Sequence, residues 1–167
     1  MRALNAGVLE SIPDGELEEA IIDFVIQKIE KAEGGRTKGY ETFKIMPMGL
    51  QAIFILWEAE AEVRNGGFNQ LFWNKGEQLA RMALACLKMI GALEHAKVFN
   101  EAIATQRSEA AEIQRFRDKG TIEAFSESIK HSKLGEVNQA FFELKEDLGA
   151  LRVTFIRKNP DLFTCTL

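Results

Sequence analysis

The hydrophobic residues of this chain recur mostly at spacings of three and four, which is the periodicity of helices that bury one face. In the first such segment, residues 15–32, Leu17, Ile21 and Phe24 share one side. A second segment, residues 49–64, is apolar on nearly all sides over its first half. A helix of that kind is expected to be buried at the centre of the fold.

Glycine is expected to end the first helix, at the Gly34–Gly35 pair, and a polar linker is expected from there to about Pro47. No alternation of the kind that strands show extends over a useful length. Five further helices are predicted, over residues 77–90, 96–119, 122–129, 140–144 and 148–156. The pattern therefore predicts an all-α fold, with a single compact multi-helix domain over residues 1–167.

Length and composition agree with such a fold. A chain of 167 residues fits one domain, and 46% hydrophobic with 28% charged residues is typical of folded soluble proteins. Cys86 and Cys165 have no metal-type spacing, and no apolar run approaches the roughly 18 residues of a membrane span. The early apolar stretch is too short and broken for a secretory signal. We expect a reduced cytoplasmic protein that binds no cofactor, no metal and no membrane.

The stretch RNGGFNQLFWN, residues 64–74, combines two adjacent glycines with asparagines and aromatic residues. Gly66 and Gly67 permit a sharp reversal, because glycine tolerates left-handed backbone conformations without a steric penalty. Asn65 is short enough to bond the exposed backbone groups at the turn. Phe68 then begins a new helix, with its apolar side facing the helix just ended. We call residues 64–74 the glycine corner.

Gln70 and Asn74 stand four residues apart on one helical face, so they can tie this corner to a neighbouring helix. The corner is therefore interpreted as structural. The alternative is a pocket in which Asn65, Gln70 and Asn74 bind a small molecule or a peptide beside aromatic rings. Catalysis is not favoured, because the corner holds no Ser, Cys, His or Asp, and His95 and His131 lie far away in sequence.

The acidic residues are concentrated early in the chain. Residues 1–62 hold 12 acidic and 6 basic side chains, although the whole chain has a net charge of only −4. Four of these acids fall within about 60° of a helical circumference, since each residue adds about 100°. This acidic stripe consists of Glu16, Glu19, Asp23 and Glu30. A solvated face is the simpler interpretation, and a surface that binds a basic partner is the functional one.

Three further acids, Glu58, Glu60 and Glu62, crowd the end of the second long helix, where the macrodipole disfavours negative charge by about 0.3–1 kcal/mol each. Broken local rules gather at functional sites, so Glu58 and Glu62 join the stripe as predicted partner-binding residues. In the simpler explanation, Arg64 or the positive start of the helix at Phe68 offsets them. A hydrolytic enzyme using Glu58 and Glu62 is the third and weakest alternative.

Other chemistry is poorly represented. The glycine pairs lack the lysine and hydroxyl of a phosphate-binding loop. A direct nucleic-acid binder would need a basic stripe, and the best candidate, Arg107 to Lys119, is interrupted by Glu109, Glu112 and Asp118. We therefore expect no direct contact with nucleic acid.

The segment EVRNGGFNQLFWN resembles the signature of a family of small helical bacterial proteins, a domain of unknown function whose named member is a DNA mimic. The later AFFELKEDLGALRVTFIRKNPDLF is similar to the ending of that family, so the resemblance covers about residues 45–163. Five positions match the signature, and Leu71 departs from it because the family often has an aromatic residue there. The matching residues are Asn65, Gly66, Gly67, Phe68 and Gln70.

This resemblance implies an all-helical fold, a homodimer and no known catalytic activity. In the named member an acidic surface imitates DNA phosphates and blocks the DNA-binding face of a transcription factor. The acidic residues of that surface lie outside the signature and are not carried over. The sequence predicts a protein-binding regulator that engages a DNA-binding protein, with a small-molecule or peptide binder as the alternative.

Overall fold

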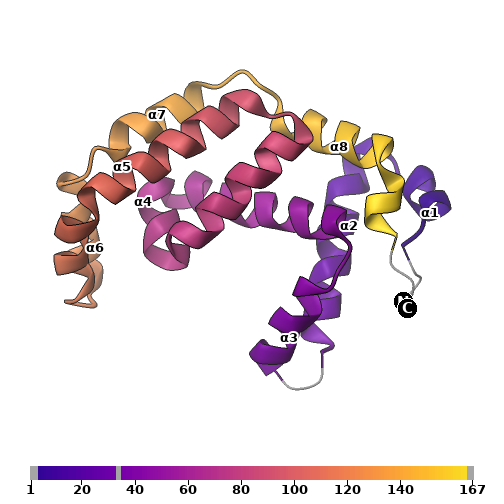
Figure 1. The fold of residues 1–167 in the computed structure, drawn as a ribbon, viewed down its shortest axis with the longest axis horizontal. Coiled ribbons are helices and arrows are strands. Elements are labelled where there is room, and N and C mark those ends of the chain that lie inside the picture. Colours follow the sequence, from indigo (N-terminus) through magenta and orange to yellow (C-terminus); the bar gives the residue numbers. More distant parts are fainter. Residues whose placement is uncertain (1–3, 33–34, 165–167) are drawn as a thin grey trace. The chain divides into compact units, whose positions relative to one another are not determined.

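The computed structural model describes residues 4–32 and 35–164 and is helical nearly throughout (Figure 1). No strand occurs in these two ranges, so the predicted all-α class is confirmed. The helices are α1 (Ala6–Ser11), α2 (Asp14–Glu30), α3 (Gly35–Lys44), α4 (Met48–Ile90), α5 (Leu93–Arg117), α6 (Ile122–Lys130), α7 (Leu134–Glu143), α8 (Leu148–Lys158) and the 3-10 helix η1 (Pro160–Phe163).

The predicted polar linker before Pro47 is wrong, because α3 occupies most of it. The helix packs on α2 and buries Phe43. Gly39 permits the close approach, since a Cβ there would lie 2.9 Å from Cγ2 of Ile29. Of the glycines expected to end α2, Gly34 lies outside the described residues, and α2 itself ends at Glu30.

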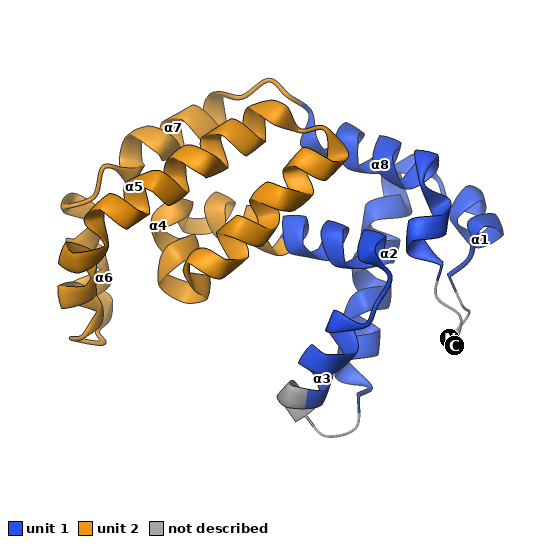
Figure 2. Cartoon of the chain, in the orientation of Figure 1, with its two compact units in different colours: residues 1–57, 147–167 blue, residues 58–146 orange. Residues whose placement is uncertain are grey.

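Two compact units make up the chain (Figure 2). Unit 1 comprises residues 1–57 and 147–167, and within it α8 packs on α2. Arginines of α8 bind acids of α2. Arg152 is buried and pairs with Glu18, while Arg157 donates to Asp14 Oδ1 over 2.7 Å. These pairs join the two stretches of sequence that form unit 1.

Unit 2 comprises residues 58–146 and holds the rest of α4 with α5, α6 and α7. In this unit α5 runs beside α7 and contacts α6 (Figure 1). Its core includes an aromatic cluster in which the ring of Phe68 meets the rings of Phe99 and Phe141 edge-on, at centroid distances of 5.0 and 5.8 Å. All three rings are buried. The glycine corner therefore supplies a central residue of the unit 2 core.

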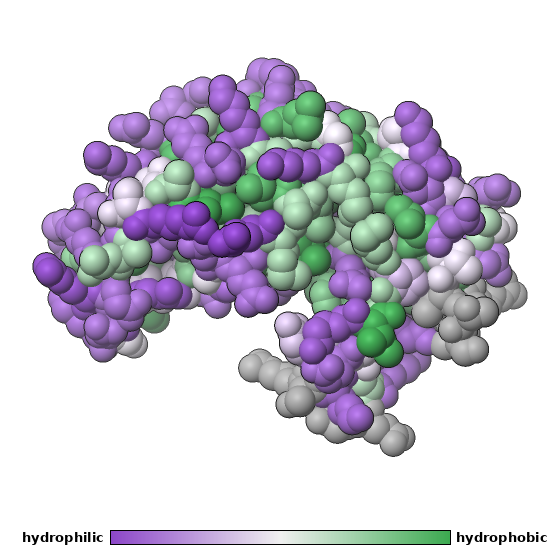
Figure 3. Space-filling view, viewed as in Figure 1, coloured by the Kyte–Doolittle hydropathy of each residue, from purple (hydrophilic) through white to green (hydrophobic). Residues whose placement is uncertain are grey.

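The surface of α6 shown in Figure 3 is mainly hydrophilic. Among the described residues, no helix combines the length and the apolar character needed to cross a membrane. Cys86 is buried and free, whereas Cys165 lies outside the described residues.

Candidate functional site

The backbone of α4 leaves the helical conformation at the glycine corner and again ten residues later. Gly66 has φ −155° and ψ 26°, and Gly67 has φ 71° and ψ −176°. Gly76 repeats the second conformation, with φ 73° and ψ −177°. This region of backbone space is open almost only to glycine. The two breaks delimit a short helical segment, residues 68–75, that was predicted at its start but not at its end.

Close packing adds a second reason for glycine at the corner. A Cβ on Gly66 would lie 2.3 Å from Oε1 of Gln70, and one on Gly67 would lie 2.4 Å from Nδ2 of Asn138. A Cβ on Gly76 would meet nothing within 4 Å. The same backbone conformation is therefore crowded at Gly67 and open at Gly76.

The carboxylate of Glu62 binds the amides of the segment that follows the break. Nε2 of Gln70 and Nδ2 of Asn74 both donate to its Oε2, over 2.8 and 3.0 Å. Nδ2 of Asn65 donates in turn to Oε1 of Gln70, over 3.0 Å. These bonds join the helical turn before the glycines to the one after them, so the amides act as ties within the corner.

Lys75 and Arg64 offset the negative charges of the acids that end the helical segment before the glycines. Nζ of Lys75 lies 2.6 Å from Glu58 Oε1 and 3.9 Å from Glu62 Oε1. Nε of Arg64 lies 2.6 Å from Glu60 Oε1, which is the offset proposed from the sequence. Lys75 was not expected as a partner from local sequence patterns, because its contact with these acids depends on the reversal at the glycines. Glu58 and Glu62 are thus engaged within unit 2, and their predicted binding of a partner stays a prediction.

Asn138 of α7 closes the other side of the corner and was not expected from the sequence. Its Oδ1 accepts from the Phe68 N–H over 2.7 Å, and its Nδ2 donates to Oδ1 of Asn69 over 3.2 Å. The first N–H groups of a helical segment have no carbonyl acceptor inside that segment. Asn138, from another helix, supplies an acceptor for the N–H of Phe68. Seventy residues separate Asn138 from Phe68, and no local pattern could connect them.

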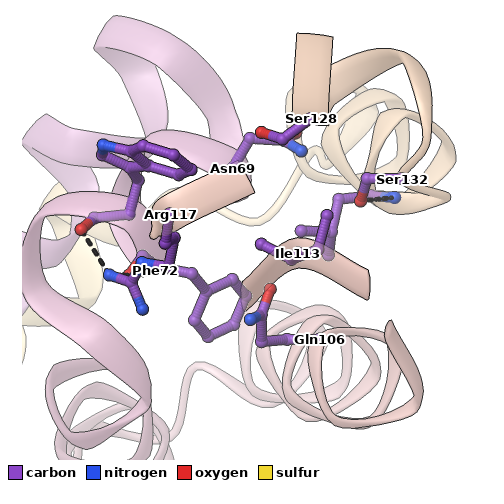
Figure 4. Close-up of a pocket in the computed structure, with 9 residues that line it drawn as sticks. Asn69, Phe72, Gln106, Ile113, Arg117, Ser128 and Ser132 are labelled. Carbon is purple, nitrogen blue, oxygen red and sulfur yellow. Dashed lines mark hydrogen bonds between the residues drawn. The ribbon is translucent and has the colours of Figure 1, made fainter. Parts of the chain in front are cut away.

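Beside Asn69 lies a small hollow, whose lining includes Gln106, Ser128 and Ser132 (Figure 4). Its volume of about 10 Å³ leaves room for roughly one water molecule. The hollow is therefore too small for a substrate.

The acidic stripe on α2 has a different environment. Glu16, Glu19, Asp23 and Glu30 are all exposed. Within residues 4–32 and 35–164 none of the four forms a hydrogen bond or an ion pair, although α2 carries other acids that do, namely Asp14 and Glu18. The structure therefore leaves this row of charges available to solvent or to a partner.

His95 and Glu146 form a further polar pair in unit 2. The buried His95 ring lies with Nδ1 2.6 Å from Glu146 Oε2, and the same carboxylate accepts from the backbone N–H groups of His95 and Glu94 at the start of α5. Burial raises the pKa of Glu146, but the hydrogen bonds from His95 and Glu94 outweigh it and hold that pKa below the usual value. Because the Glu146 carboxylate accepts from N–H groups in the first turn of α5, it caps that helix. The described residues also contain no cluster of three or more side chains able to hold a metal.

A family model described as DMP19-like protein matches residues 45–159, which is more than half of the chain. The match includes the glycine corner and Asn138, and it begins after α2. No curated protein and no solved structure matches the chain.

Proposed function

We propose that the chain, which belongs to the family of DMP19-like proteins, is a non-enzymatic regulator that binds another protein through the acidic stripe of α2. The partner in this proposal is a DNA-binding protein, and the stripe occupies the basic face that would otherwise hold DNA. The observation that carries the proposal is the contrast in pairing: the four acids of the stripe are exposed and unpaired among the described residues, while Glu58 and Glu62 are not.

The spacing of the stripe supports a basic partner better than a detailed copy of DNA. With a rise of about 1.5 Å per residue, the four acids extend along about 21 Å of helix. Their steps of about 4.5, 6 and 10.5 Å match the roughly 3.4 Å axial phosphate step of one DNA strand only loosely. A row of charges nevertheless suits lysines and arginines, whose long side chains can adjust to uneven spacing.

The stripe lies outside the region that defines the family, since α2 ends at Glu30 and the match begins at residue 45. Family membership therefore applies to the helical region that contains the glycine corner, and α2 lies outside that region. The choice of a DNA-binding partner rests on the resemblance of that corner to the signature of the family with the DNA mimic, together with the charges on α2.

The test is a competition for DNA. A basic DNA-binding protein captured from native cells with the immobilised chain is identified and mixed with fluorescent DNA. The chain should release the DNA, and release should weaken as salt rises, because salt screens exposed charges. A variant with Glu16→Gln, Glu19→Gln and Asp23→Asn should release far less. Sedimentation of the free chain in the same buffer tests the homodimer that the family resemblance implies.

A matched control neutralises three exposed acids of unit 2, none of which forms an ion pair among the described residues: Glu101→Gln, Glu123→Gln and Glu136→Gln. This variant has the same net charge as the α2 variant. It should release DNA as well as the unchanged chain does. An equal loss of release in both variants would show that only net charge matters, and undiminished release by the α2 variant would likewise rule out the stripe as the binding surface.

A further inference from the structure

An open groove of about 360 Å³ lies beside the glycine corner, entirely within unit 2. Its volume falls in the range of about 300–1,000 Å³ that is common for ligand sites. One wall comes from α4, and the other comes from the end of α5 and the start of α6. Its lining includes Trp73, Asn74, Arg117, Ile122 and Phe125.

Two aromatic rings give the groove an apolar part. Trp73 and Phe125 lie with ring centroids 5.1 Å apart. Ile122 adds to this surface, and its side chain is 80% exposed. When a ligand covers such apolar side chains, binding is stabilised because apolar surface is removed from water.

Arg117 places a positive charge beside these rings. Its Nη2 donates to the carbonyl oxygens of Phe72 and Trp73, over 3.0 and 2.5 Å, and its guanidinium carbon lies 5.6 Å from the centre of the Trp73 ring (Figure 4). These carbonyls lie in the last turn before the break at Gly76, and the last carbonyls of a helical segment commonly need partners from outside it. The arginine is thereby held in place from one edge.

Apart from these bonds, the guanidinium has no hydrogen-bond partner in the described part of the chain. Arginine carries five N–H donors, and the two bonds to the backbone carbonyls use Nη2 only. No carboxylate pairs with Arg117 in residues 4–32 and 35–164. A half-buried arginine with spare donors at Nε and Nη1, lining a groove, is suited to bind a carboxylate through a charge-assisted hydrogen bond.

Asn74 adds a hydrogen-bond acceptor on the opposite wall. Its Nδ2 is bound to Glu62, which fixes the orientation of the amide. Its Oδ1 forms no hydrogen bond in the described part of the chain and can accept one from a ligand N–H.

We propose that this groove binds the C-terminal residue of a peptide that ends in an apolar side chain. The free carboxylate pairs with Arg117, the side chain covers Trp73 and Phe125, and the backbone N–H donates to Oδ1 of Asn74. A C-terminal residue carries carboxylate and side chain on one Cα, which agrees with the short distances from Arg117 to Trp73 and from Trp73 to Phe125. An internal acidic residue would place its carboxylate and the neighbouring apolar side chain on different Cα atoms.

This site is independent of the proposed binding by α2. It lies in the other unit, it carries the opposite charge, and it requires none of the acids of the stripe. A failure of either proposal therefore leaves the other intact.

The test uses the fluorescence of Trp73 in a Trp57→Phe background, where it is the one remaining tryptophan. The probes are acetyl-Gly-Gly-Leu with a free carboxylate and the same peptide with a terminal carboxamide. The acid should bind saturably, and the carboxamide at least about tenfold more weakly, since a charged pair contributes 1.4 kcal/mol or more. Arg117→Gln should remove this difference, whereas Arg115→Gln, which removes an exposed charge two residues away, should preserve it.

A second pair of variants avoids the helix-capping role of Arg117. Ile122 is largely exposed, so Ile122→Asp and Ile122→Asn should both fold, as checked by circular dichroism. The aspartate should weaken binding of the acid peptide more than the asparagine does, because only the aspartate repels a carboxylate. The proposal is overturned if acid and carboxamide bind equally, if neither binds at millimolar concentration, or if the two Ile122 variants bind the acid equally.

Discussion

Two rows of carboxylates in this protein look alike in sequence and have opposite surroundings. On α2, Glu19 and Asp23 are exposed, and no side chain in the described residues binds them. Near the glycine corner, Glu58 and Glu62 have the same spacing, at four residues apart. There, however, Lys75 and two amides bind them.

The difference arises from the segment of chain that follows each row of acids. After α2 the next packed helix is α3, and no side chain that the structure describes there donates to the stripe. After Glu62 the glycines turn the backbone, and the next helical segment presents Gln70, Asn74 and Lys75 to the acids just passed. Acid spacing along a helix therefore identifies a shared face, whereas the path of the backbone decides whether that face is free.

The largest expected effect concerns the turn itself. Gly67→Ala should destabilise the protein by about 3 kcal/mol or more, because it combines strained backbone, worth about 1–3 kcal/mol, with a Cβ placed 2.4 Å from Asn138. Gly76→Ala is the matched control, with the same backbone conformation and no neighbour within 4 Å. Gly76→Ala should lose only the part of the unfolding free energy that comes from backbone strain. Urea unfolding followed by circular dichroism measures both losses.

Gly67→Ala is expected to lose more unfolding free energy than Gly76→Ala, and this additional loss should depend on Asn138. In an Asn138→Gly background the clash is absent, so the additional cost of Gly67→Ala should fall toward that of Gly76→Ala. An unchanged cost in that background would mean that crowding by Asn138 does not distinguish the two glycines.

A smaller effect is expected when one acid is removed from each row. Glu62→Ala should cost about 1.5–3 kcal/mol, the range for hydrogen bonds to a charged group, because Gln70 and Asn74 lose their shared acceptor. Glu19→Ala should change stability by no more than about 0.5 kcal/mol, since surface substitutions without partners rarely do more. Similar losses for the two variants would remove the contrast between the rows.

Glu146 offers a smaller test that uses pH. Its folded-state pKa lies below the ordinary value of 4.5, because hydrogen bonds from His95 and Glu94 outweigh the effect of burial. Its contribution is therefore fully present above that ordinary value and is lost as pH falls through the lower folded-state pKa. Below pH 4.5 the unchanged protein should lose unfolding free energy more steeply than Glu146→Gln does. Parallel curves in urea titrations would contradict this linkage.

The smallest expected change is in stability after the stripe is neutralised. The variant with Glu16→Gln, Glu19→Gln and Asp23→Asn should unfold within about 0.5 kcal/mol of the unchanged protein at physiological salt, because exposed charges there are largely screened. A loss well beyond this, measured in the same urea titrations, would mean that these acids support the fold and are not free for a partner.

Local patterns in the sequence predict most helices and the break at Gly66–Gly67. The glycine Gly76 is not predicted as a break, because its neighbours continue a helical pattern on both sides. The linker before Pro47 is misjudged because α3 is polar at most positions; it buries Phe43, and packing of this kind supplies most helical stability in proteins.

The candidate site is predictable only where its residues are close in sequence. Gln70 and Asn74 could be placed on one face because they lie one turn apart. Asn138, Arg117 and Glu146 contact residues 44 to 70 positions away, and nothing in their own neighbourhoods indicates a partner. For such contacts the fold must be known first.

The two stretches that form unit 1 have a consequence for synthesis on the ribosome. Residues 147–158, with Arg152 and Arg157, are translated long after α2 has emerged. Until then Glu18 and Asp14 lack these partners, and α2 lacks α8 beside it. A nascent chain that has just completed residues 58–146 can fold that unit from contiguous sequence, whereas the scaffold of the acidic helix is completed only after residues 147–158 have also been translated.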